Sequence, residues 1–339
     1  MNLIFMIGNG FDKNLGLKTS YTEFYDYYVN LPSKNEIIKK FKEDIKNEDY
    51  KNWADLELGL GEYSVNCTAE EDYIYIIKDV SKELKKYLEL VLEEHIYENP
   101  IEKIRDEFLN FKQYLSNANQ AIYDKFVKKE QDLDINIINF NYTNTLERIL
   151  KLKVPFQLNN KNIKGKTYYS NVKQHIHIHG NLKDSMILGV NDYTQIKNKN
   201  MRTTNVIENI VKPTMNMNAE TLREYDCEKI ISEANIVVIY GMSIGETDKC
   251  WWEKLMLRFS QDPSVLIIIV NYDGQIEYTF RQRFAYKKRE FKNRLLNYVT
   301  NNDCQSNENE LKTVIENRII VEFNTEMFKF KVYKKGKFA

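Results

Sequence analysis

The chain has 339 residues, and its 49 Lys plus Arg balance 49 Asp plus Glu, so its formal net charge is zero. This balance excludes a protein held to nucleic acid by a general basic field, although not one with a local basic patch. Hydrophobic residues at 42%, aromatics at 13% and only 5 Pro and 12 Gly exclude disordered, collagen-like and linker-dominated chains. The length favours about two domains.

We expect neither a membrane span nor a secretory leader. The longest apolar runs, such as residues 265–270, are far shorter than the roughly 20 residues that a span needs. The apolar N-terminal run lacks a positively charged flank and a small-residue cleavage site. The four cysteines are scattered without Cys-x-x-Cys spacing, which argues against a disulfide framework and against a zinc ribbon. A cytoplasmic location is therefore expected.

The predicted elements change character along the chain. Residues 2–7 form an apolar run that predicts a buried strand, and glycines follow it at a tight turn. Between residues 33 and 128 the apolar positions have helical spacing, which predicts three or four amphipathic helices. Further strands are predicted at residues 135–140, 174–179, 186–190, 236–240, 265–270 and 318–323. Helices are predicted at 219–234, 248–259 and 275–289, and loops at 151–170 and 301–310.

Apolar strands that alternate with helices are typical of an α/β fold with a mostly parallel sheet covered on both faces. We predict a Rossmann-like sheet with a helical insertion after the first strand. Residues 1–32 and 129–339 are expected to form the Rossmann-like domain, and residues 33–128 the helical insertion packed on it.

The first candidate site is the turn after the first strand, with the letters GNGFD at residues 8–12. Glycine allows a tight turn and the close approach of a ligand, and a following helix would offer its amides to a phosphate. Lys13 stands where the dinucleotide fingerprint has its third glycine, so a structural turn is the alternative. Gly16 and the polar residues 19–21 extend the motif and favour a site. A branched side chain at Gly10 is expected to weaken nucleotide binding more than folding.

The second candidate is the segment NFNYTN at residues 139–144, which closes the predicted strand 135–140. Polar residues at the carboxyl end of a strand lie where open α/β sheets hold ligands. An amide side chain there can place a water molecule or bond a sugar hydroxyl. Asn141 is the predicted functional residue, whereas Thr143 and Asn144 are expected to cap the next helix.

The third candidate contains three of the four histidines, His175, His177 and His179, at alternate positions of a predicted strand. The spacing places them on one face, and imidazoles suit proton transfer or metal binding near neutral pH. Only His179, beside Gly180 at the carboxyl end, is expected to reach the cleft. The other two are expected to bond protein groups and to matter for stability. No cysteine or acidic partner lies nearby in sequence, so we predict no metal ligand.

The fourth candidate follows the predicted strand 236–240, where Ser243 and Asp248 could contact a ligand. Residues 241–245 match the five letters of the nucleophile elbow of α/β-hydrolases, Gly-x-Ser-x-Gly. That fold needs an acid and then a histidine after the serine. No histidine follows Ser243, so the elbow interpretation fails. In the inserted region, Glu57 is a candidate to face the same cleft.

In this order, the blocks resemble the bacterial abortive-infection AbiH family. The matching residues are 8–12, 16–17, 19–21, 53–57, 139–147, 177–180 and 240–252. They span most of the chain. More distantly, the arrangement is similar to sirtuin-like NAD-consuming domains. Those domains have a Gly-x-Gly turn after the first strand, an Asn that closes an inner strand, a downstream His-Gly pair and a Gly-x-Ser turn.

The chain also departs from the sirtuin pattern. It lacks the four-cysteine zinc module, and Asp12 and Tyr21 replace the usual Ser and Arg. Thr143 stands where those domains have an Asp two residues after the Asn. Deacetylation of proteins is therefore not expected, whereas cleavage of NAD remains open.

The resemblance implies an antiphage abortive-infection effector that hydrolyses NAD to nicotinamide and ADP-ribose, with NAD as substrate and no prosthetic group. It implies His179 as the base and Asn141 as the residue that holds the attacking water. The expected nucleotide contacts are Gly8, Asn9, Gly10, Phe11, Asp12, Thr19, Tyr21, Gly241, Ser243 and Asp248.

Two alternatives stay open: a non-enzymatic nucleotide-binding sensor of phage infection, and a metal-dependent hydrolase that uses the strand of three histidines. The expected partners are NAD or a related nucleotide and a phage-derived trigger. A homo-oligomer is left open, and neither a membrane nor a nucleic acid is expected to bind.

Overall fold

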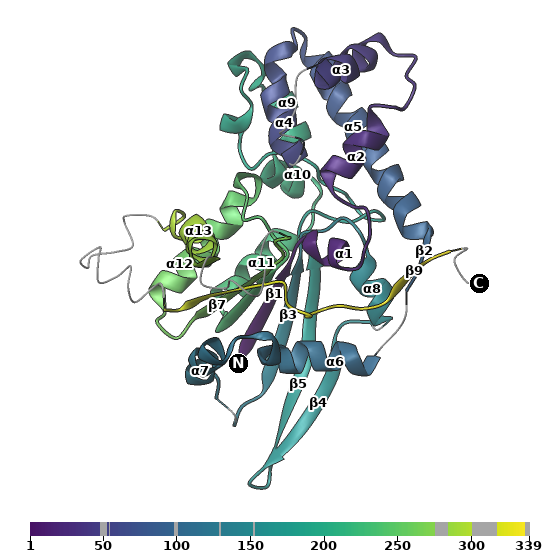
Figure 1. The fold of residues 1–339 in the computed structure, drawn as a ribbon. Coiled ribbons are helices and arrows are strands. Elements are labelled where there is room, and N and C mark those ends of the chain that lie inside the picture. The colour runs from purple at the N-terminus through teal and green to yellow at the C-terminus, as the bar shows by residue number, and fades with distance from the viewer. Residues whose placement is uncertain are drawn as a thin grey trace.

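The structure is a computed structural model that describes residues 1–47, 53, 55–97, 101–128, 130–151, 153–274, 284–299 and 317–335. Its centre is a seven-stranded sheet (Figure 1). In the order of the sheet, the strands are β4 (Phe156–Ile163), β5 (Lys166–His177), β3 (Leu133–Asn139), β1 (Asn2–Ile7), β6 (Ile236–Tyr240), β7 (Leu266–Asn271) and β8 (Ile319–Phe323). A separate antiparallel pair joins β2 (His95–Tyr97) to β9 (Val332–Lys334).

All neighbouring strands of the large sheet are parallel except β4, which is antiparallel to β5. Counted along the chain, the six parallel strands lie in the order 3-2-1-4-5-6, the order of Rossmann folds. The order reverses at β1, so the carboxyl ends of β1 and β6 mark the switch point where such sheets bind ligands. The predicted Rossmann-like class is confirmed.

The central strands are continuous apolar runs because both of their faces are covered. On β1, Leu3 and Phe5 belong to one hydrophobic core and Ile4 and Met6 to another. The period of two along a strand explains this division.

Helices on both sides of the sheet complete the layers. In chain order the helices are α1 (Gly10–Asn14), α2 (Tyr21–Tyr28), α3 (Glu36–Asn47), α4 (Leu56–Tyr63), α5 (Glu70–Glu93), α6 (Ile101–Asn110), α7 (Asn117–Phe126), α8 (Thr145–Leu150), α9 (Thr204–Ile210), α10 (Lys212–Asn218), α11 (Arg223–Ser232), α12 (Lys249–Gln261) and α13 (Ala285–Leu296). Buried residues of α11, α12 and α13 pack in the hydrophobic core that contains Ile4 and Met6 of β1. On the other face, Phe108 of α6 packs edge-on against Phe5, with ring centroids 5.1 Å apart.

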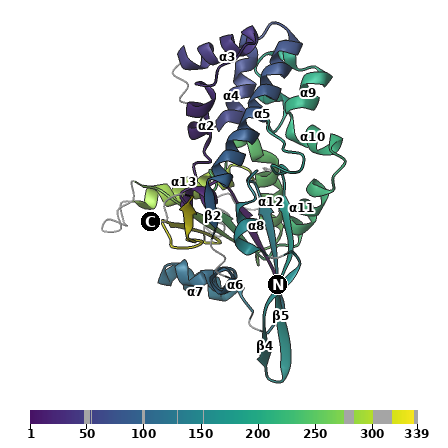
Figure 2. The ribbon, with the colours of Figure 1, turned by 90° about the vertical axis from the view of Figure 1, so that its right-hand side faces the viewer.

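The inserted helices occupy two places. Helices α2 to α5 stand above the carboxyl edge of the sheet together with α9 and α10, whereas α6 and α7 lie lower (Figures 1 and 2). Within residues 33–128 the described part contains α3 to α7, rather than three or four helices. The boundaries of the two domains stay a prediction.

Two secondary-structure predictions are wrong. Much of the predicted loop 151–170 forms β4 and the start of β5, joined by a turn at Lys164 and Gly165, both with positive φ. Such turns join hairpin strands because their twist matches that of the strands. Many residues of this hairpin, which projects from the sheet in Figure 2, are exposed. Its sequence therefore lacks the apolar pattern from which a strand can be predicted.

The predicted strand 186–190 is an irregular segment instead. Ile187 and Leu188 are buried there. The amide of Ile187 bonds the carbonyl of His179, and Val190 makes an isolated bridge to Val211. The apolar run reflected burial rather than strand pairing. The predicted loop 301–310 and the start of the predicted helix 275–289 lie outside the described residues.

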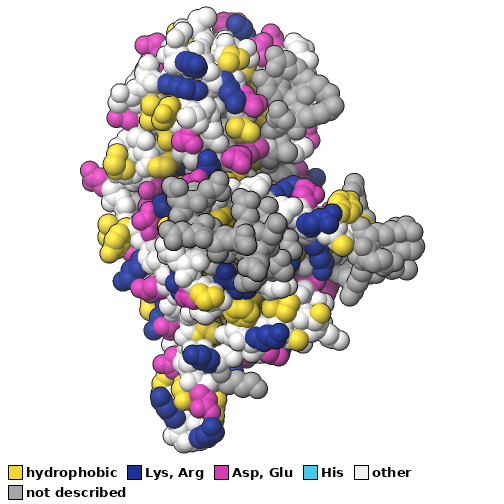
Figure 3. All heavy atoms as spheres, turned by 90° about the vertical axis from the view of Figure 1, so that its left-hand side faces the viewer, with side chains coloured by type: hydrophobic (Ala, Val, Ile, Leu, Met, Phe, Trp, Pro, Cys, Tyr) yellow, Lys and Arg dark blue, Asp and Glu magenta, His cyan; other side chains and the backbone are white. Residues whose placement is uncertain are grey.

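Surface and hydropathy add two observations. On the face shown in Figure 3, the described basic and acidic side chains are interspersed rather than separated into patches. Across the described stretches, none of the helices combines the length and the apolar character needed to cross a bilayer.

Candidate functional site

A cavity of about 1200 Å³ lies at the carboxyl edge of the sheet. Its lining comes from the turns after β1, β3, β6 and β7 and from the helices above them. Parallel strands bring their carboxyl ends to one edge, so residues far apart in sequence meet there. Of the predicted site residues, the cavity is lined by Gly8, Asn9, Gly10, Asp12, Thr19, Tyr21, Asn141, His179, Gly241, Ser243 and Asp248.

The glycine turn at residues 8–12 packs directly against the turn after β6. The amide of Gly10 donates to the carbonyl of Gly241 at 2.8 Å, and the amide of Phe11 donates to that of Gly8 at 2.9 Å. A Cβ atom at Gly10 would lie 2.4 Å from the Cα of Gly241. The contact between the two turns therefore requires glycine, so a side chain at Gly10 is expected to weaken folding as well. Its larger effect on nucleotide binding stays a prediction. Two of the amides at the start of α1 that were expected to face a phosphate, those of Gly10 and Phe11, are already bonded.

Other residues of this block also have structural partners. Asn9 and Thr19 bond each other twice, since the Thr19 hydroxyl donates to Oδ1 of Asn9 at 2.6 Å and Nδ2 of Asn9 donates to the Thr19 carbonyl at 3.1 Å. Phe11 does not line the cavity; its buried ring packs against Tyr240 and Phe328. The contact predicted between Phe11 and the nucleotide stays a prediction that the lining of this cavity does not support.

Asn141 follows β3 and is buried at the floor of the cavity. Its amide donates to Oδ1 of Asn139 at 3.0 Å, and its Nδ2 donates to the carbonyl of Gly8 at 3.1 Å. These bonds hold the side chain beside the glycine turn. Its Oδ1 has no hydrogen-bond partner within the described part of the chain, so it can accept a bond from water or from a sugar hydroxyl.

The predicted capping roles of Thr143 and Asn144 are wrong. Asn144 stands at the N-cap of α8, but its side chain makes no capping bond and instead accepts from Nε of Arg148 at 2.8 Å. The Thr143 hydroxyl donates to Oδ2 of Asp12 at 2.6 Å. The other oxygen of Asp12, Oδ1, is buried without a partner among the described residues. Burial raises the pKa of Asp12 to about 6, against the hydrogen bond from Thr143, which lowers it.

Asp12→Asn is expected to stabilise the protein above pH 6. An unfolded Asp ionises near pH 4, whereas the folded carboxyl stays protonated up to about pH 6. Stability is therefore lost as the pH rises through this window, by about 3 kcal/mol for a shift of about two units. Denaturant unfolding should show a gain for the variant at pH 7.5 and almost none at pH 4. An equal difference at the two pH values would assign the effect to packing instead.

His179 follows the end of β5, and its ring is almost fully buried at the cavity. Its Nε2 lies 2.7 Å from Oδ1 of Asp248, and its Nδ1 has no partner among the described residues. The edge of its ring meets Phe140, which stacks on Trp252 of α12. A carboxylate only accepts hydrogen bonds, so Nε2 carries a proton and the neutral ring has its lone pair on Nδ1.

Lys212, the first residue of α10, is buried and joins two acids. Its Nζ lies 2.6 Å from Oε2 of Glu57 and 2.9 Å from Oδ1 of Asp248. Burial would raise the pKa of Asp248, but the charge of Lys212 and the bond from His179 hold it well below its usual range. Burial would likewise lower the pKa of Lys212, but Asp248 and Glu57 raise it above its usual range. All of these contacts favour an ionised Asp248 beside His179.

Glu57 links the helical layer to the sheet. Its Oε1 faces the hydroxyls of Tyr21, at 3.1 Å, and Tyr142, at 2.9 Å. Glu57 lines the cavity, as predicted. The hydroxyl of Tyr21 is already hydrogen-bonded to the carboxylate of Glu57. Lys212 and Tyr142 had not been predicted. A single buried lysine at a helix start has no local signal, because its acidic partners are distant in the sequence.

The other two histidines do not line the cavity. His177 lies 2.6 Å from Oε1 of Glu147, and His175 lies 3.2 Å from Nδ2 of Asn139. Burial lowers the pKa of His175 to about 4. The three histidines therefore lie in two environments: His179 lines the cavity, whereas His175 and His177 bond protein groups outside it.

The turn after β6 contributes mainly backbone. Gly241 has a φ of 65°, in the left-handed region that favours glycine. Ser243 is exposed at the cavity rim, and its carbonyl accepts from Arg294 of α13 at 2.9 Å. Of the predicted residues in this turn, Asp248 has a partner that can transfer protons, namely His179.

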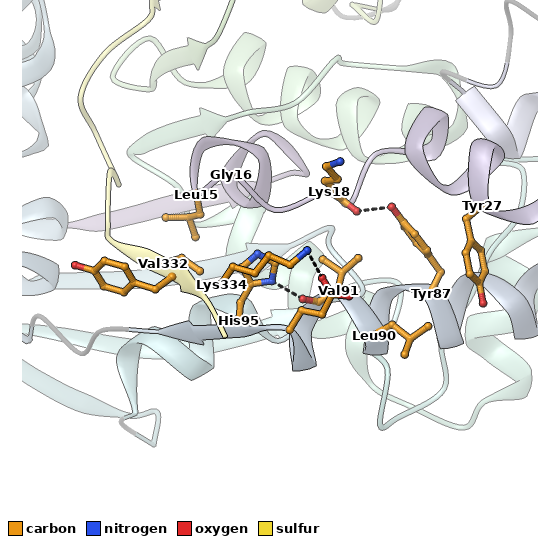
Figure 4. A pocket seen from close by; sticks show the side chains of 12 residues that line it. Leu15, Gly16, Lys18, Tyr27, Tyr87, Leu90, Val91, His95, Val332 and Lys334 are labelled. Carbon is orange, nitrogen blue, oxygen red and sulfur yellow. Dashed lines mark hydrogen bonds and ion pairs between the residues drawn. The ribbon is translucent and has the colours of Figure 1, made fainter. Parts of the chain in front are cut away.

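A second cavity, of about 920 Å³, lies between α1, α5 and β9 (Figure 4). Its polar groups bond one another: the Tyr87 hydroxyl donates to the Lys18 carbonyl at 2.9 Å, and Lys334 pairs with Glu94 at 2.9 Å. His95 bonds the carbonyl of Val91. Since these groups already have protein partners, the cavity of His179 is the stronger candidate for chemistry.

A comparison with known protein families finds a match. The profile described as "Bacteriophage abortive infection AbiH" matches residues 4–272, a range that includes the glycine turn, Glu57, Asn141, His179, Lys212 and Asp248. A comparison with curated proteins finds no match. Because the matched range covers most of the chain, this protein belongs to the bacteriophage abortive infection AbiH family.

Proposed function

We propose that this protein is an antiphage effector that hydrolyses the nicotinamide–ribose bond of NAD, giving nicotinamide and ADP-ribose. Membership of the AbiH family supports the role in phage abortive infection. The observation that carries the enzymatic proposal is the pair of His179 and Asp248 in the cavity that Asn141 also lines. It lies at the edge where Rossmann-like sheets bind nucleotides.

The reaction needs little acid catalysis. The nicotinamide nitrogen of NAD is cationic, so it takes the electron pair of the broken bond and leaves as a neutral molecule. Positive charge develops on the ribose in the transition state. The oxygen of a water molecule then bonds to the ribose carbon and gives up one proton. The protein therefore has to place the water, accept that proton and stabilise the positive charge.

His179 and Asn141 are suited to the first two tasks. Nε2 donates its hydrogen bond to Asp248, which leaves the lone pair of His179 on Nδ1. Nδ1 is a buried atom without a partner among the described residues, so the ring has to turn toward the cavity before a water molecule can reach it. Nδ1 is the atom that would take the proton of the water. The uncommitted Oδ1 of Asn141 would orient the water or a ribose hydroxyl.

The charges around Lys212 suit the third task. Lys212 contributes one positive charge, whereas Glu57 and Asp248 contribute two negative charges. Their sum is a net negative charge at the cavity wall, which favours a cationic nicotinamide ring and the positive charge of the transition state.

The decisive experiment is to incubate the purified full chain with NAD and to search for nicotinamide and ADP-ribose by chromatography. The proposal predicts equimolar release of both products. Binding of NAD by calorimetry without any release would favour the sensor that signals without catalysis.

Asn141→Ala is expected to lower kcat for this reaction by about 100-fold, because an oriented water is lost. KM should change less, since the side chain is assigned to the reacting water rather than to the rest of the dinucleotide. The matched control is Asn144→Ala in the same loop, whose side chain bonds Arg148 and does not line the cavity. Equal kcat values for the two variants would remove Asn141 from the mechanism.

A further inference from the structure

A second cluster of chemically reactive side chains lies outside the cavity. It consists of Glu147 from α8 and of His175 and His177 from β5, and we call it the Glu147 cluster. One nitrogen or oxygen atom from each residue lies within 4.8 Å of the other two. The histidine side chains are 6% and 7% exposed and that of Glu147 is 37% exposed, so the cluster is open to solvent on the side of Glu147.

The hydrogen bonds of His177 pose a problem for a neutral ring. Its Nδ1 lies 2.7 Å from the carbonyl oxygen of Asn141, and its Nε2 lies 2.6 Å from Oε1 of Glu147. Both oxygens only accept hydrogen bonds, whereas a neutral imidazole has one donor. The pair therefore needs a second positive centre: either a second proton in the bond between Nε2 and Glu147, or a metal ion that both side chains bind in place of that hydrogen bond.

The surroundings match those of a metal site. A histidine that binds a metal through one ring nitrogen usually donates the other N–H to a backbone carbonyl or a carboxylate, as Nδ1 of His177 is placed to do. Nδ1 of His175 lies 4.0 Å from the same oxygen of Glu147, too far for a hydrogen bond. The second oxygen, Oε2, is buried without a partner in the described part of the chain.

We infer that the Glu147 cluster binds a divalent transition-metal ion of the zinc class, with two imidazoles and one carboxylate as ligands. Zinc accepts such a set of nitrogen and oxygen ligands. The ion would join α8 to the end of β5. Through His177 it would also hold the carbonyl of Asn141 in place, which gives it a positioning role beside the cavity. His179 is not a ligand, because its Nε2 is paired with Asp248.

The position of the proton on the ring of His175 decides whether this residue can bind the metal. Nδ2 of Asn139 faces Nε2 of His175 at 3.2 Å, while Oδ1 of Asn139 accepts from the amide of Asn141. This arrangement places the proton of His175 on Nδ1 when no ion is bound. For Nδ1 to bind the ion, this proton must move to Nε2 and the NH2 group of Asn139 must turn away from it. An Asp at position 139 could accept both from Nε2–H and from the Asn141 amide. Asn139→Asp is therefore expected to increase the metal affinity, about 10-fold or more.

The test uses the full chain, stripped of metal with a chelator and titrated with Zn²⁺ alone in a calorimeter. One equivalent should bind with micromolar affinity or tighter. His175→Gln, His177→Gln and Glu147→Gln should each weaken binding at least 10-fold. The matched control, His95→Gln, removes the histidine outside both sites and should bind as the wild type does. Titration with Co²⁺ should give visible absorption bands that report a nitrogen and oxygen environment.

The outcomes separate the proposal from its alternative. Absence of Zn²⁺ binding by the folded wild type would overturn the metal site and leave a charged His177–Glu147 pair. Unchanged binding in the two histidine variants would overturn it as well. Circular dichroism establishes that each variant is folded. If His177→Gln does not fold, the partly exposed Glu147→Gln and the gain expected for Asn139→Asp still decide the question. Ion binding is measured without NAD, so this result does not depend on the proposed reaction.

Discussion

His179→Gln is expected to lower the rate of nicotinamide release by about 100-fold to 10,000-fold, the usual contribution of a general base. Glutamine can still donate to the carboxylate of Asp248, but its amide cannot take up a proton. The fold should survive, because glutamine can keep the hydrogen bond to Asp248 that holds this buried side chain in place. The measurement is single-turnover cleavage of NAD, with the melting temperature recorded in parallel.

His95→Gln is the matched control, because His95 lies in the second cavity and bonds a backbone carbonyl. It should cleave NAD at the rate of the wild type. Asp248→Asn should fall between the two, since an amide can still contact His179 but no longer favours the tautomer with its lone pair on Nδ1. Full activity of His179→Gln would exclude this histidine as the base, even if NAD is the substrate.

Gly241→Ala is expected to destabilise the fold by about 3 kcal/mol or more. A Cβ atom at this position would lie 2.6 Å from the Cα of Gly10, so the turns after β1 and β6 would have to separate. Overpacking of this kind typically costs about 1–3 kcal/mol, and the left-handed φ of 65° adds about 1–2 kcal/mol for any other residue. Denaturant unfolding of the variant and the wild type measures the difference.

Gly16→Ala separates the two contributions. Gly16 also has a positive φ, 79°, but an added Cβ atom would meet no other atom within 4 Å. Its replacement should therefore cost only the conformational part, about 1–2 kcal/mol. If the two variants lost the same stability, the contact between the turns would contribute nothing. Gly10→Val should show the contact part of the loss without the conformational part, because Gly10 has no positive φ and its Cβ would lie 2.4 Å from the Cα of Gly241.

The sequence alone predicted the parallel strands of the sheet and the approximate positions of their ends. Strands buried on both faces must be apolar along their whole length, and β1, β6 and β7 are such runs. Strand ends in turn predict which residues reach the ligand-binding edge, and Asn141, His179 and Asp248 all line the cavity. The β4–β5 hairpin was missed because a strand exposed on both faces carries no hydropathy pattern.

What the tertiary structure decided is which groups pair across long distances in the chain. Lys212 reaches Glu57 and Asp248 only because helices above the sheet fold back over its carboxyl edge. Glu147 reaches His177 because α8, which follows β3, lies beside the end of the neighbouring strand β5. The glycines of the first turn were correctly singled out from the sequence. They are required because this turn packs against the turn of Gly241, which comes much later in the chain. Local sequence patterns record burial and backbone preference, whereas the pairing of charges depends on topology. The sequence by itself therefore determined the fold class and the edge that carries the site, and the tertiary structure alone determined the partner of each reactive group.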